Sequence, residues 1–249
     1  MKKNKHAETS QSHFSKRAPK YNGSARWVCD GKLISKICSS AKPARGSVVL
    51  DLALGTGRIA MGFKGRVRTV IGLDTCPKMS LQSRKYIDCL VLGRAEHMPF
   101  PDDTFDIISC RQGLQFMELE KALAEIRRVL KPGGRVVFCH LTSYGGEDDK
   151  TAFLTQRLRN PARKNFFSPG DLGRITGKYL SGVRTTEYVT RESVKNWVTH
   201  GAIPAAARAR IMAVYKNSPA AFRDTHKIVF KNGDVFDSMR MEIIAAVKK

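Results

Sequence analysis

The 249-residue chain lacks the features of membrane, secreted and zinc proteins. No apolar run approaches the ~20 residues that cross a bilayer. The basic start of the chain is not followed by the apolar segment of a secretory signal. The six cysteines form no C-x-x-C pair, so clustered ligands are missing and no metal site is expected. We therefore expect a cytoplasmic protein with reduced cysteines that pack as small hydrophobic groups.

Acidic residues are scarce, with 22 Asp and Glu against 44 Lys and Arg, which gives a net charge of +22. The excess lies in two flanks: 11 basic against 2 acidic residues in 1–46, and 19 against 10 in 142–249, compared with 14 against 10 in 47–141. Such a field favours anionic partners, namely nucleic acid, acidic lipid surfaces or acidic small molecules. A solvated basic surface explains the charge equally well, and the oligomeric state stays open.

Apolar runs alternate with helical patterns in the middle of the chain. The runs predict strands at 46–54, 66–74, 87–93, 105–110 and 135–141. Helical patterns lie between them, from residue 57 onward and at 77–87 and 118–130. Strands that alternate with helices imply a parallel sheet with right-handed crossovers. We therefore predict an α/β fold with a doubly wound, Rossmann-like, mostly parallel sheet.

The two flanks depart from this alternation. Residues 1–20 are polar and basic, so we expect no stable element there before a ligand binds, and a helix is predicted over about 24–40. Beyond residue 142, helices fit about 149–159, 168–178, 191–200 and 204–216, with no strand predicted before residue 227. Two β-rich runs around 232–234 then predict an antiparallel C-terminal hairpin.

The strongest local motif is the segment 49–57, in which a buried strand ends in a glycine turn that opens a helix. Gly55 and Gly57 let the backbone approach a ligand closely, and ligands of parallel sheets lie at the carboxyl ends of strands. Asp74 ends the next strand and can accept hydrogen bonds from both ribose hydroxyls. The glycines with Ala60 also fit the dinucleotide fingerprint of dehydrogenases, so these residues alone leave NAD open.

Three further segments separate these alternatives: 93–106 after the third strand, 110–116 after the fourth, and 127–134 before the fifth. With the first two motifs, they resemble class I S-adenosylmethionine-dependent methyltransferases of type 11, the ubiquinone/menaquinone methyltransferase-like family. The resemblance covers about residues 46–141. It implies S-adenosyl-L-methionine as the cofactor and methyl transfer as the reaction.

The resemblance also implies the cofactor-binding residues. The first motif would wrap the methionine part of the cofactor through Asp51, Ala53, Gly55, Thr56 and Gly57. The end of the second strand would bind the ribose through Asp74, Thr75 and Met79. The segment after the third strand would flank the adenine with Arg94, Ala95 and Glu96, and the segment after the fourth would face the methyl with Arg111, Gln112 and Gln115. Tyr21 lies in a segment that folds over the cofactor in this family.

Two positions depart from the family pattern. Ala53 stands where glycine is usual, although relatives with alanine are familiar. Arg94 stands where Asp or Asn usually accepts a hydrogen bond from the adenine amino group, and arginine has only donors. Adenine would then be held mainly by the backbone at Ala95, or Arg94 would swing away.

Methyl transfer from a sulfonium is an in-line displacement, in which the enzyme mainly holds the acceptor and the methyl in line and excludes water. A general base is needed only when the acceptor must lose a proton. His140, at the end of the fifth strand, is the best-placed base, with a histidine bonded to backbone at the core edge as the alternative. Tyr21 and Gln115 are the other candidates for catalytic roles.

These expectations divide the chain into four parts. Residues 1–45 are interpreted as a basic tail and helix covering the cofactor site, 46–141 as the S-adenosylmethionine-binding core, 142–226 as a helical substrate-recognition cap, and 227–249 as strands completing the sheet. Basic residues of the cap would face an acidic acceptor, among them Arg157, Arg159, Arg163, Lys164 and Arg184.

We expect methyl transfer to O, N or C of a small-molecule acceptor, including aromatic or anionic compounds. An RNA methyltransferase is the first alternative, supported by the net charge. Against it, the chain has no recognisable RNA-binding module and no Asn/Asp-Pro-Pro-Tyr segment after the fourth strand. A non-catalytic scaffold and an NAD dehydrogenase are the remaining alternatives.

Overall fold

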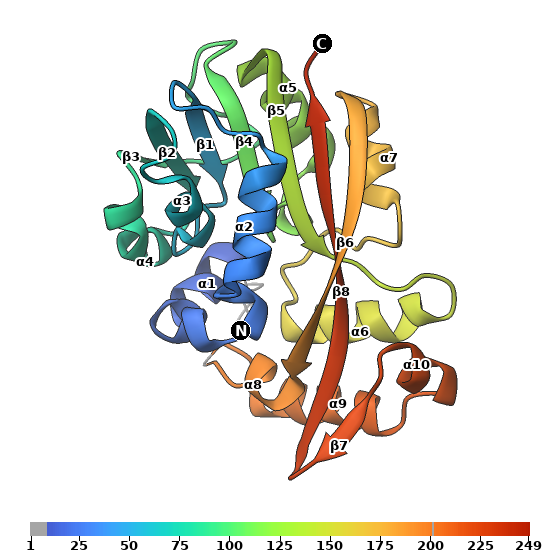
Figure 1. Ribbon diagram of the computed structural model, residues 1–249. Coiled ribbons are helices and arrows are strands. Elements are labelled where there is room, and N and C mark those ends of the chain that lie inside the picture. Colours follow the sequence, from blue (N-terminus) through green and yellow to red (C-terminus); the bar gives the residue numbers. More distant parts are fainter. Residues whose placement is uncertain (1–8, 201) are drawn as a thin grey trace, which may run out of the picture.

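The computed structural model describes residues 9–200 and 202–249, and in these ranges one eight-stranded sheet runs through the molecule (Figure 1). Its strand order is β3-β2-β1-β4-β5-β8-β6, and β7 pairs with β8. The parallel strands are β1 (Val48–Leu52), β2 (Thr69–Asp74), β3 (Cys89–Leu92), β4 (Phe105–Arg111) and β5 (Leu130–Leu141). β8 (Asp234–Val247) runs antiparallel between β5 and β6 (Ser181–Ser193). The predicted doubly wound, mostly parallel sheet is confirmed.

The two faces of the sheet build separate apolar cores because side chains alternate along each strand. On one face Val49, Ile107 and Val137 pack with α2 (Gly31–Ser40) and α3 (Arg58–Phe63). On the other face Leu50 and Ile108 pack with α5 (Leu119–Val129) and α7 (Asp171–Gly177). β1 therefore lies buried on both faces, as its continuous apolar run predicted.

The strand order reverses between β1 and β4. The chain passes from β1 outward to β2 and β3, then returns to the other side of β1 to form β4 and β5. In a doubly wound sheet, this reversal opens a crevice at the carboxyl ends of the two strands. Those ends point toward the lower half of Figure 1, where α1 (Ser10–Arg17) and α6 (Asp148–Arg159) lie.

The segment before β1 differs from its prediction in two places. Residues 10–23 form helical structure, α1 followed by the 3₁₀ helix η1 (Ala18–Gly23), whereas residues 1–8 of the predicted tail lie outside the described residues. Gln11 Nε2 donates to Thr75 O (2.8 Å) and Gln82 Nε2 donates to Ala18 O (2.7 Å). These hydrogen bonds connect α1 and η1 to the segment after β2. The expectation of no stable element was therefore wrong here.

The helix predicted over 24–40 is also interrupted. A 3₁₀ turn, η2 (Arg26–Val28), precedes α2, and the Asp30 carboxylate accepts from the N–H groups of Lys32 (3.0 Å) and Leu33 (3.2 Å). Asp30 is thus the N-cap that starts α2, a position for which aspartate is strongly favoured.

The region 142–226 is helical only in part. Its helices are α6, α7, α8 (Val194–Val198), α9 (Ala205–Lys216) and α10 (Ala220–Thr225). Residues 181–193, for which no strand was predicted, form β6 and pair with β8 from Ser181 to Ser193, so the helix predicted over 191–200 begins only at Val194. β6 is an edge strand with many exposed polar side chains, which hides the alternation that marks a half-buried strand.

The remaining elements agree more closely with the sequence. The helix predicted at 77–87 is present as α4 (Pro77–Ser80) and the 3₁₀ helix η3 (Leu81–Tyr86), and another 3₁₀ turn, η4 (Leu114–Phe116), follows β4. The C-terminal hairpin is confirmed: β7 (Val229–Lys231) turns into β8 through Asn232 and Gly233, whose φ angles of 53° and 70° suit a type I′ turn. In the described part of the chain no helix is long and apolar enough to cross a bilayer.

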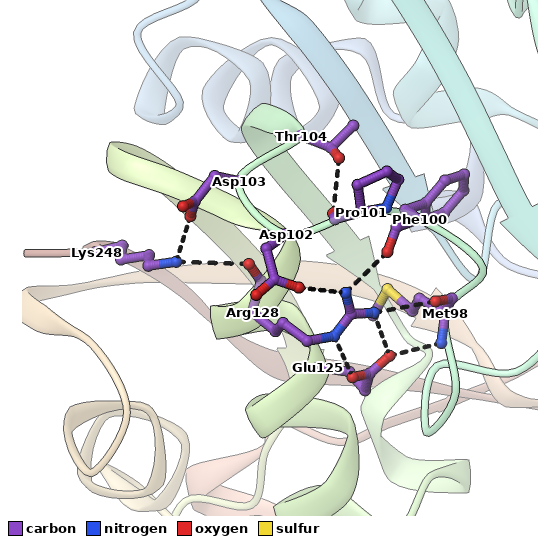
Figure 2. A network of polar contacts seen from close by, with 9 residues as sticks. All are labelled: Met98, Phe100, Pro101, Asp102, Asp103, Thr104, Glu125, Arg128 and Lys248. Atoms are coloured by element: carbon purple, nitrogen blue, oxygen red, sulfur yellow. Dashed lines mark hydrogen bonds and ion pairs between the residues drawn. The ribbon is translucent and has the colours of Figure 1, made fainter.

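Arg128 of α5 holds the loop that follows β3 in place through hydrogen bonds (Figure 2). Its guanidinium donates to both oxygens of Glu125, to the Asp102 carboxylate, and to the carbonyl oxygens of Met98 and Phe100 at 2.6–3.0 Å. Glu125 also accepts from the Met98 N–H (2.7 Å). One side chain therefore fixes the path of the loop that continues from the predicted adenine-binding residues.

A second polar cluster joins α6, α9 and α10 to β8. His226 lies between Asp148 and Asp237, with 2.7 Å from each ring nitrogen to a carboxylate oxygen, and Tyr215 donates to Asp237 (2.6 Å). Burial opposes charging of this imidazole, but the hydrogen bonds to Asp148 and Asp237 outweigh burial and raise the pKa of His226 to about 9.

Replacing Arg128 by alanine should lower the free energy of unfolding by roughly 2–3 kcal/mol, because several charged hydrogen bonds are lost and backbone acceptors are left unpaired. Arg127→Ala, at the exposed neighbouring position, should change it by less than about 0.5 kcal/mol. Urea denaturation of the three proteins measures both values. Equal effects of the two substitutions would contradict the role given to Arg128.

The charge of His226 should make stability fall at alkaline pH. Because its folded-state pKa of about 9 lies above the ordinary 6.5, the stabilisation is complete below pH 6.5 and disappears as the pH rises through 9. The difference in unfolding free energy between wild type and His226→Gln should shrink by roughly 3 kcal/mol from pH 6 to pH 10. The exposed His97→Gln serves as the control, and a pH-independent difference would refute the charged cluster.

Candidate functional site

A cavity of about 730 Å³ lies at the carboxyl ends of β1, β2 and β4. The turn after β1, the end of β2, the segment after β3 and the turn after β4 form its walls, and Phe14 of α1 adds an aromatic side chain. Most of the residues predicted from the sequence to bind the cofactor line it: Tyr21, Ala53, Gly55, Asp74, Thr75, Met79, Arg94, Ala95, Glu96, Arg111 and Gln112. We call this space the cofactor cavity.

The other predicted cofactor residues lie elsewhere. Asp51 and Thr56 line an adjoining space of about 300 Å³ that shares Tyr21 and Arg111 with the cofactor cavity. Gly57 lines neither space. A Cβ at this position, where φ is 72°, would lie 2.6 Å from the Ser83 Cβ, so Gly57 is required for packing at the start of α3.

Asp74 ties the glycine turn to the end of β2. Its Oδ2 accepts from the Gly55 N–H (2.7 Å) and its Oδ1 accepts from the Cys76 N–H (2.7 Å). Burial raises the pKa of Asp74, and these hydrogen bonds oppose that shift. A carboxylate has about four acceptor positions, so Asp74 keeps room for further donors from a ligand.

Asp51 is a second carboxylate beside the site and is almost fully buried. It accepts from Ser109 Oγ (2.8 Å) and from the Ala60 N–H (3.0 Å). Burial nevertheless raises the pKa of Asp51 to about 7, against the effect of both hydrogen bonds. A positively charged group placed next to Asp51 would favour its ionised form.

The turns after β1 and β4 meet at the point where the strand order reverses. Ala53 and Gln112 both adopt left-handed backbone conformations, with φ of 55° and 57°. A Cβ on Gly113 would lie 2.5 Å from the Ala53 Cβ, so the two turns are in direct contact. Such a conformation costs a non-glycine residue about 1–2 kcal/mol, and strain of this kind gathers at ligand sites.

Arg94 borders the cavity, and its side chain is hydrogen-bonded to a neighbouring carboxylate. The side chain is 59% exposed, and its Nη2 donates to Glu96 Oε1 (3.1 Å). The same oxygen accepts from the Glu118 N–H (3.0 Å). Arg94 is thus held by Glu96 at the edge of the cavity, and the two arrangements expected for adenine binding stay predictions.

The N-terminal segment contributes Ser10, Phe14 and Tyr21 to the lining of the cofactor cavity. Tyr21 borders the cofactor cavity and the adjoining space near Asp51. The next residue, Asn22, accepts from Thr56 Oγ1 (2.8 Å) and from Arg58 Nε (3.2 Å). Hydrogen bonds to Asn22 therefore connect the N-terminal segment directly to the glycine turn after β1 and the start of α3.

His140 does not line the cofactor cavity and is fully buried behind Gln115. Its Nδ1 lies 2.9 Å from Gln115 Oε1, while Gln115 Nε2 donates to the Gln112 carbonyl (2.9 Å) and to Gln112 Oε1 (3.0 Å). Burial, with Arg163 nearby, lowers the pKa of His140 to about 3, so the imidazole is neutral. The sequence identified both residues without showing that Gln115 separates His140 from the site.

A second, narrow cavity shares Phe14, Tyr21, Gln112 and Phe116 with the cofactor cavity. Arg17, Arg159 and Arg163 also line it, so we call it the arginine cavity. The sequence singled out Arg159 and Arg163 by their charge. It gave no signal for Arg17, which is brought there by α1.

Comparisons with known proteins bear on the chemistry of this site. Residues 50–138 match the family model described as "Methyltransferase domain" (Methyltransf_11). The chain is 29% identical over 238 residues to the uncharacterized methyltransferase YcgJ of Bacillus subtilis, with 90% of this chain and 93% of that protein covered. The crystal structure of YcgJ has the same fold, with a TM-score of 0.78 and 24% identity over 87% of this chain and 97% of that one.

Two further relatives concern the reaction and the cofactor. A demethylmenaquinone methyltransferase of Thermobifida fusca is 39% identical over 106 residues, which cover 39% of this chain and 44% of that protein. Phosphoethanolamine N-methyltransferase 2 of Haemonchus contortus, solved with S-adenosyl-L-methionine, has a TM-score of 0.58 and 18% identity over 88% of this chain and 52% of that one. The chain is therefore an S-adenosylmethionine-dependent methyltransferase, and its residues 50–138 match the type 11 methyltransferase domain.

Proposed function

We propose that this methyltransferase acts on O, N or C of a small molecule that binds in the arginine cavity. The observation that carries the proposal is the shared wall: Tyr21, Gln112 and Phe116 border both cavities. The two cavities therefore meet at these side chains, where methyl transfer would need the acceptor and the methyl in direct contact.

The lining of the cofactor cavity fits S-adenosylmethionine. Asp74 keeps acceptor positions for the ribose hydroxyls, and Gly55 brings its backbone to the cavity beside Met79, where an added Cβ would lie 3.5 Å from Cε. Asp51, whose ionisation is sensitive to a nearby cation, would bind the ammonium group of the methionine part. When bound, this cofactor supplies an electrophilic methyl on a sulfonium.

The residues at the shared wall would orient the acceptor. Gln115 is fixed by Gln112 on one side and His140 on the other, so its amide has little freedom. A neutral His140 that contacts the site only through Gln115 is a weak base, and we give it a positioning role. Gln112, whose Nε2 is buried without a hydrogen-bond partner among the described residues, is available to an acceptor.

Asp74→Ala should weaken binding of S-adenosylhomocysteine at least about 100-fold, since charged hydrogen bonds contribute 1.5–3 kcal/mol each. Asp88→Asn is the matched control, because Asp88 also accepts from a backbone N–H (Val70, 2.8 Å) but lies outside the cofactor cavity. Calorimetric titration measures both affinities, with NAD as a second ligand that should not bind. Unchanged affinity in Asp74→Ala would contradict the cofactor site.

The small-molecule acceptor is tested by following the methyl label. Wild-type protein and labelled S-adenosylmethionine are incubated with an extract of the source cells, which is then separated into low-molecular-weight and nucleic-acid fractions. We expect the label in the low-molecular-weight fraction, and none with Asp74→Ala. Label that enters RNA instead would favour the alternative supported by the charge of +22.

A further inference from the structure

Two segments that are distant in the chain bring positive charge to the arginine cavity. Arg17 ends α1, Arg159 ends α6, and Arg163 lies in the loop that follows α6. Arg17 is only 2% exposed, and the other two are half-buried. The cavity therefore exists only when the N-terminal segment and the region after β5 are folded together.

Each guanidinium has a nitrogen that is shielded from solvent and has no hydrogen-bond partner within 9–200 and 202–249. These atoms are Arg17 Nε, Arg159 Nη2 and Arg163 Nη2. The hydrogen bonds that these groups do make go to neutral oxygens: Ser24 Oγ at 3.3 Å from Arg17, the Trp197 carbonyl at 3.1 Å from Arg159, and the Asn165 carbonyl at 2.9 Å from Arg163. Donor capacity remains unused inside the fold.

No carboxylate of the described chain lies within 4.0 Å of these arginines as an ion-pair partner. Glu192 acts on Arg159 from further away. Its carboxylate is already held by the N–H groups of Arg26 (2.7 Å) and Trp27 (3.0 Å) and by the Thr190 hydroxyl (2.6 Å). Among the described residues, these charges are offset by the more distant Glu192 and by aromatic rings: Arg17 lies over Phe14 (5.2 Å) and Tyr21 (5.0 Å), Arg159 over Trp197 (4.4 Å) and Arg163 over Phe166 (5.1 Å).

Burial disfavours the charge of all three guanidinium groups, and repulsion from Arg17 and Arg163 also disfavours the charge of Arg159. Burial lowers the pKa of Arg17 to about 10 and that of Arg163 to about 9. Burial, followed by repulsion from Arg17, lowers the pKa of Arg159 well below its ordinary value. His200, which is also near Arg159 and Arg17, has its pKa lowered to about 2 by burial and by these charges, and so adds no charge. An uncompensated buried charge costs several kcal/mol, and a bound anion would remove that cost.

Neutral groups around the cavity are mostly donors too. The indole Nε1 atoms of Trp27 and Trp197 and the Asn160 Nδ2 are buried without a partner in the described ranges, and these residues line the cavity. Gln156 Oε1 is an unpaired acceptor at the same place. A set dominated by N–H donors complements an oxyanion, which only accepts.

The other basic residues that the sequence suggested for the acceptor do not share these shielded, unpaired nitrogens. Arg157, one of the basic residues that the sequence suggested for the acceptor, is exposed on the same helix and packs against the Phe166 ring (5.1 Å). Lys164 and Arg184 are exposed as well. The unpaired and shielded nitrogens belong to Arg17, Arg159 and Arg163, the residues that border the cavity.

We infer that the methyl acceptor carries an oxyanion group, a phosphate or a carboxylate, which binds among Arg17, Arg159 and Arg163. Its nucleophilic atom then extends past Gln112 and Phe116 toward the cofactor cavity. This inference rests on the proposed function, because it names the substrate class of the same site.

The test uses the full chain loaded with S-adenosylhomocysteine, titrated with phenyl phosphate, benzoate and the neutral benzyl alcohol. The chain has two tryptophans, and both line the arginine cavity, so their fluorescence reports its occupancy alongside calorimetry. We expect one or both anions to bind and the alcohol not to bind. The tighter anion identifies the group as phosphate or carboxylate.

Arg163→Gln and Arg159→Gln should each weaken anion binding at least about tenfold, with the affinity for S-adenosylhomocysteine unchanged. Arg157→Gln is the matched control and should bind anions like the wild type. Without an anion, the variants at 159 and 163 should melt no lower than the wild type, because removing an unpaired buried charge relieves its cost. A drop in melting temperature that no anion affects would assign these arginines a structural role and overturn the inference.

Other outcomes separate the two proposals. Binding of S-adenosylhomocysteine without binding of either anion overturns the inference and leaves the cofactor site intact. A loss of S-adenosylhomocysteine affinity in Arg163→Gln would show that the arginines hold the carboxylate of the cofactor, which also overturns it. Failure of the wild type to bind S-adenosylhomocysteine would remove the proposed function and the inference together.

Discussion

The reversal of strand order between β1 and β4 is the constraint on which the rest of this structure depends. It brings the turns after the two strands into contact at Ala53 and Gly113, with Ala53 and Gln112 in left-handed conformations. Asp74, at the end of β2, then accepts a hydrogen bond from the Gly55 N–H and so connects the turn after β1 to β2. The cofactor cavity is the space that these short turns leave between strand ends, so its shape is set by backbone geometry more than by any one side chain.

Segments outside the sheet complete the site by covering this crevice. The N-terminal segment contributes Arg17 and Tyr21, and the region after β5 contributes Arg159 and Arg163. Apolar packing and the His226 cluster hold the second region to the sheet, so the fold can maintain unpaired guanidinium nitrogens next to the reaction site. Stability supplied elsewhere thus sustains a local arrangement that is unfavourable without an anion.

The sequence predicted the parts that short-range patterns determine. The glycine turn, Asp74, the alternation of strands and helices and the turn at Asn232 are local signals, and each lies where it was expected. The sequence did not predict which segments that are distant in the chain lie next to each other in the fold. β6 has an exposed polar surface that conceals its pairing with β8, and nothing near Arg17 in the chain shows that α1 brings it beside Arg159. The position of His140 behind Gln115 likewise depends on the packing between β5 and the turn after β4.

The proposed cofactor and anion sites are tested most directly by a crystal structure of the protein with S-adenosylhomocysteine and phenyl phosphate. We expect the ribose hydroxyls on Asp74, and the phosphate oxygens within hydrogen-bond distance of Arg159 and Arg163. A phosphate bound outside the arginine cavity, or the cofactor carboxylate among these arginines, would contradict this expectation.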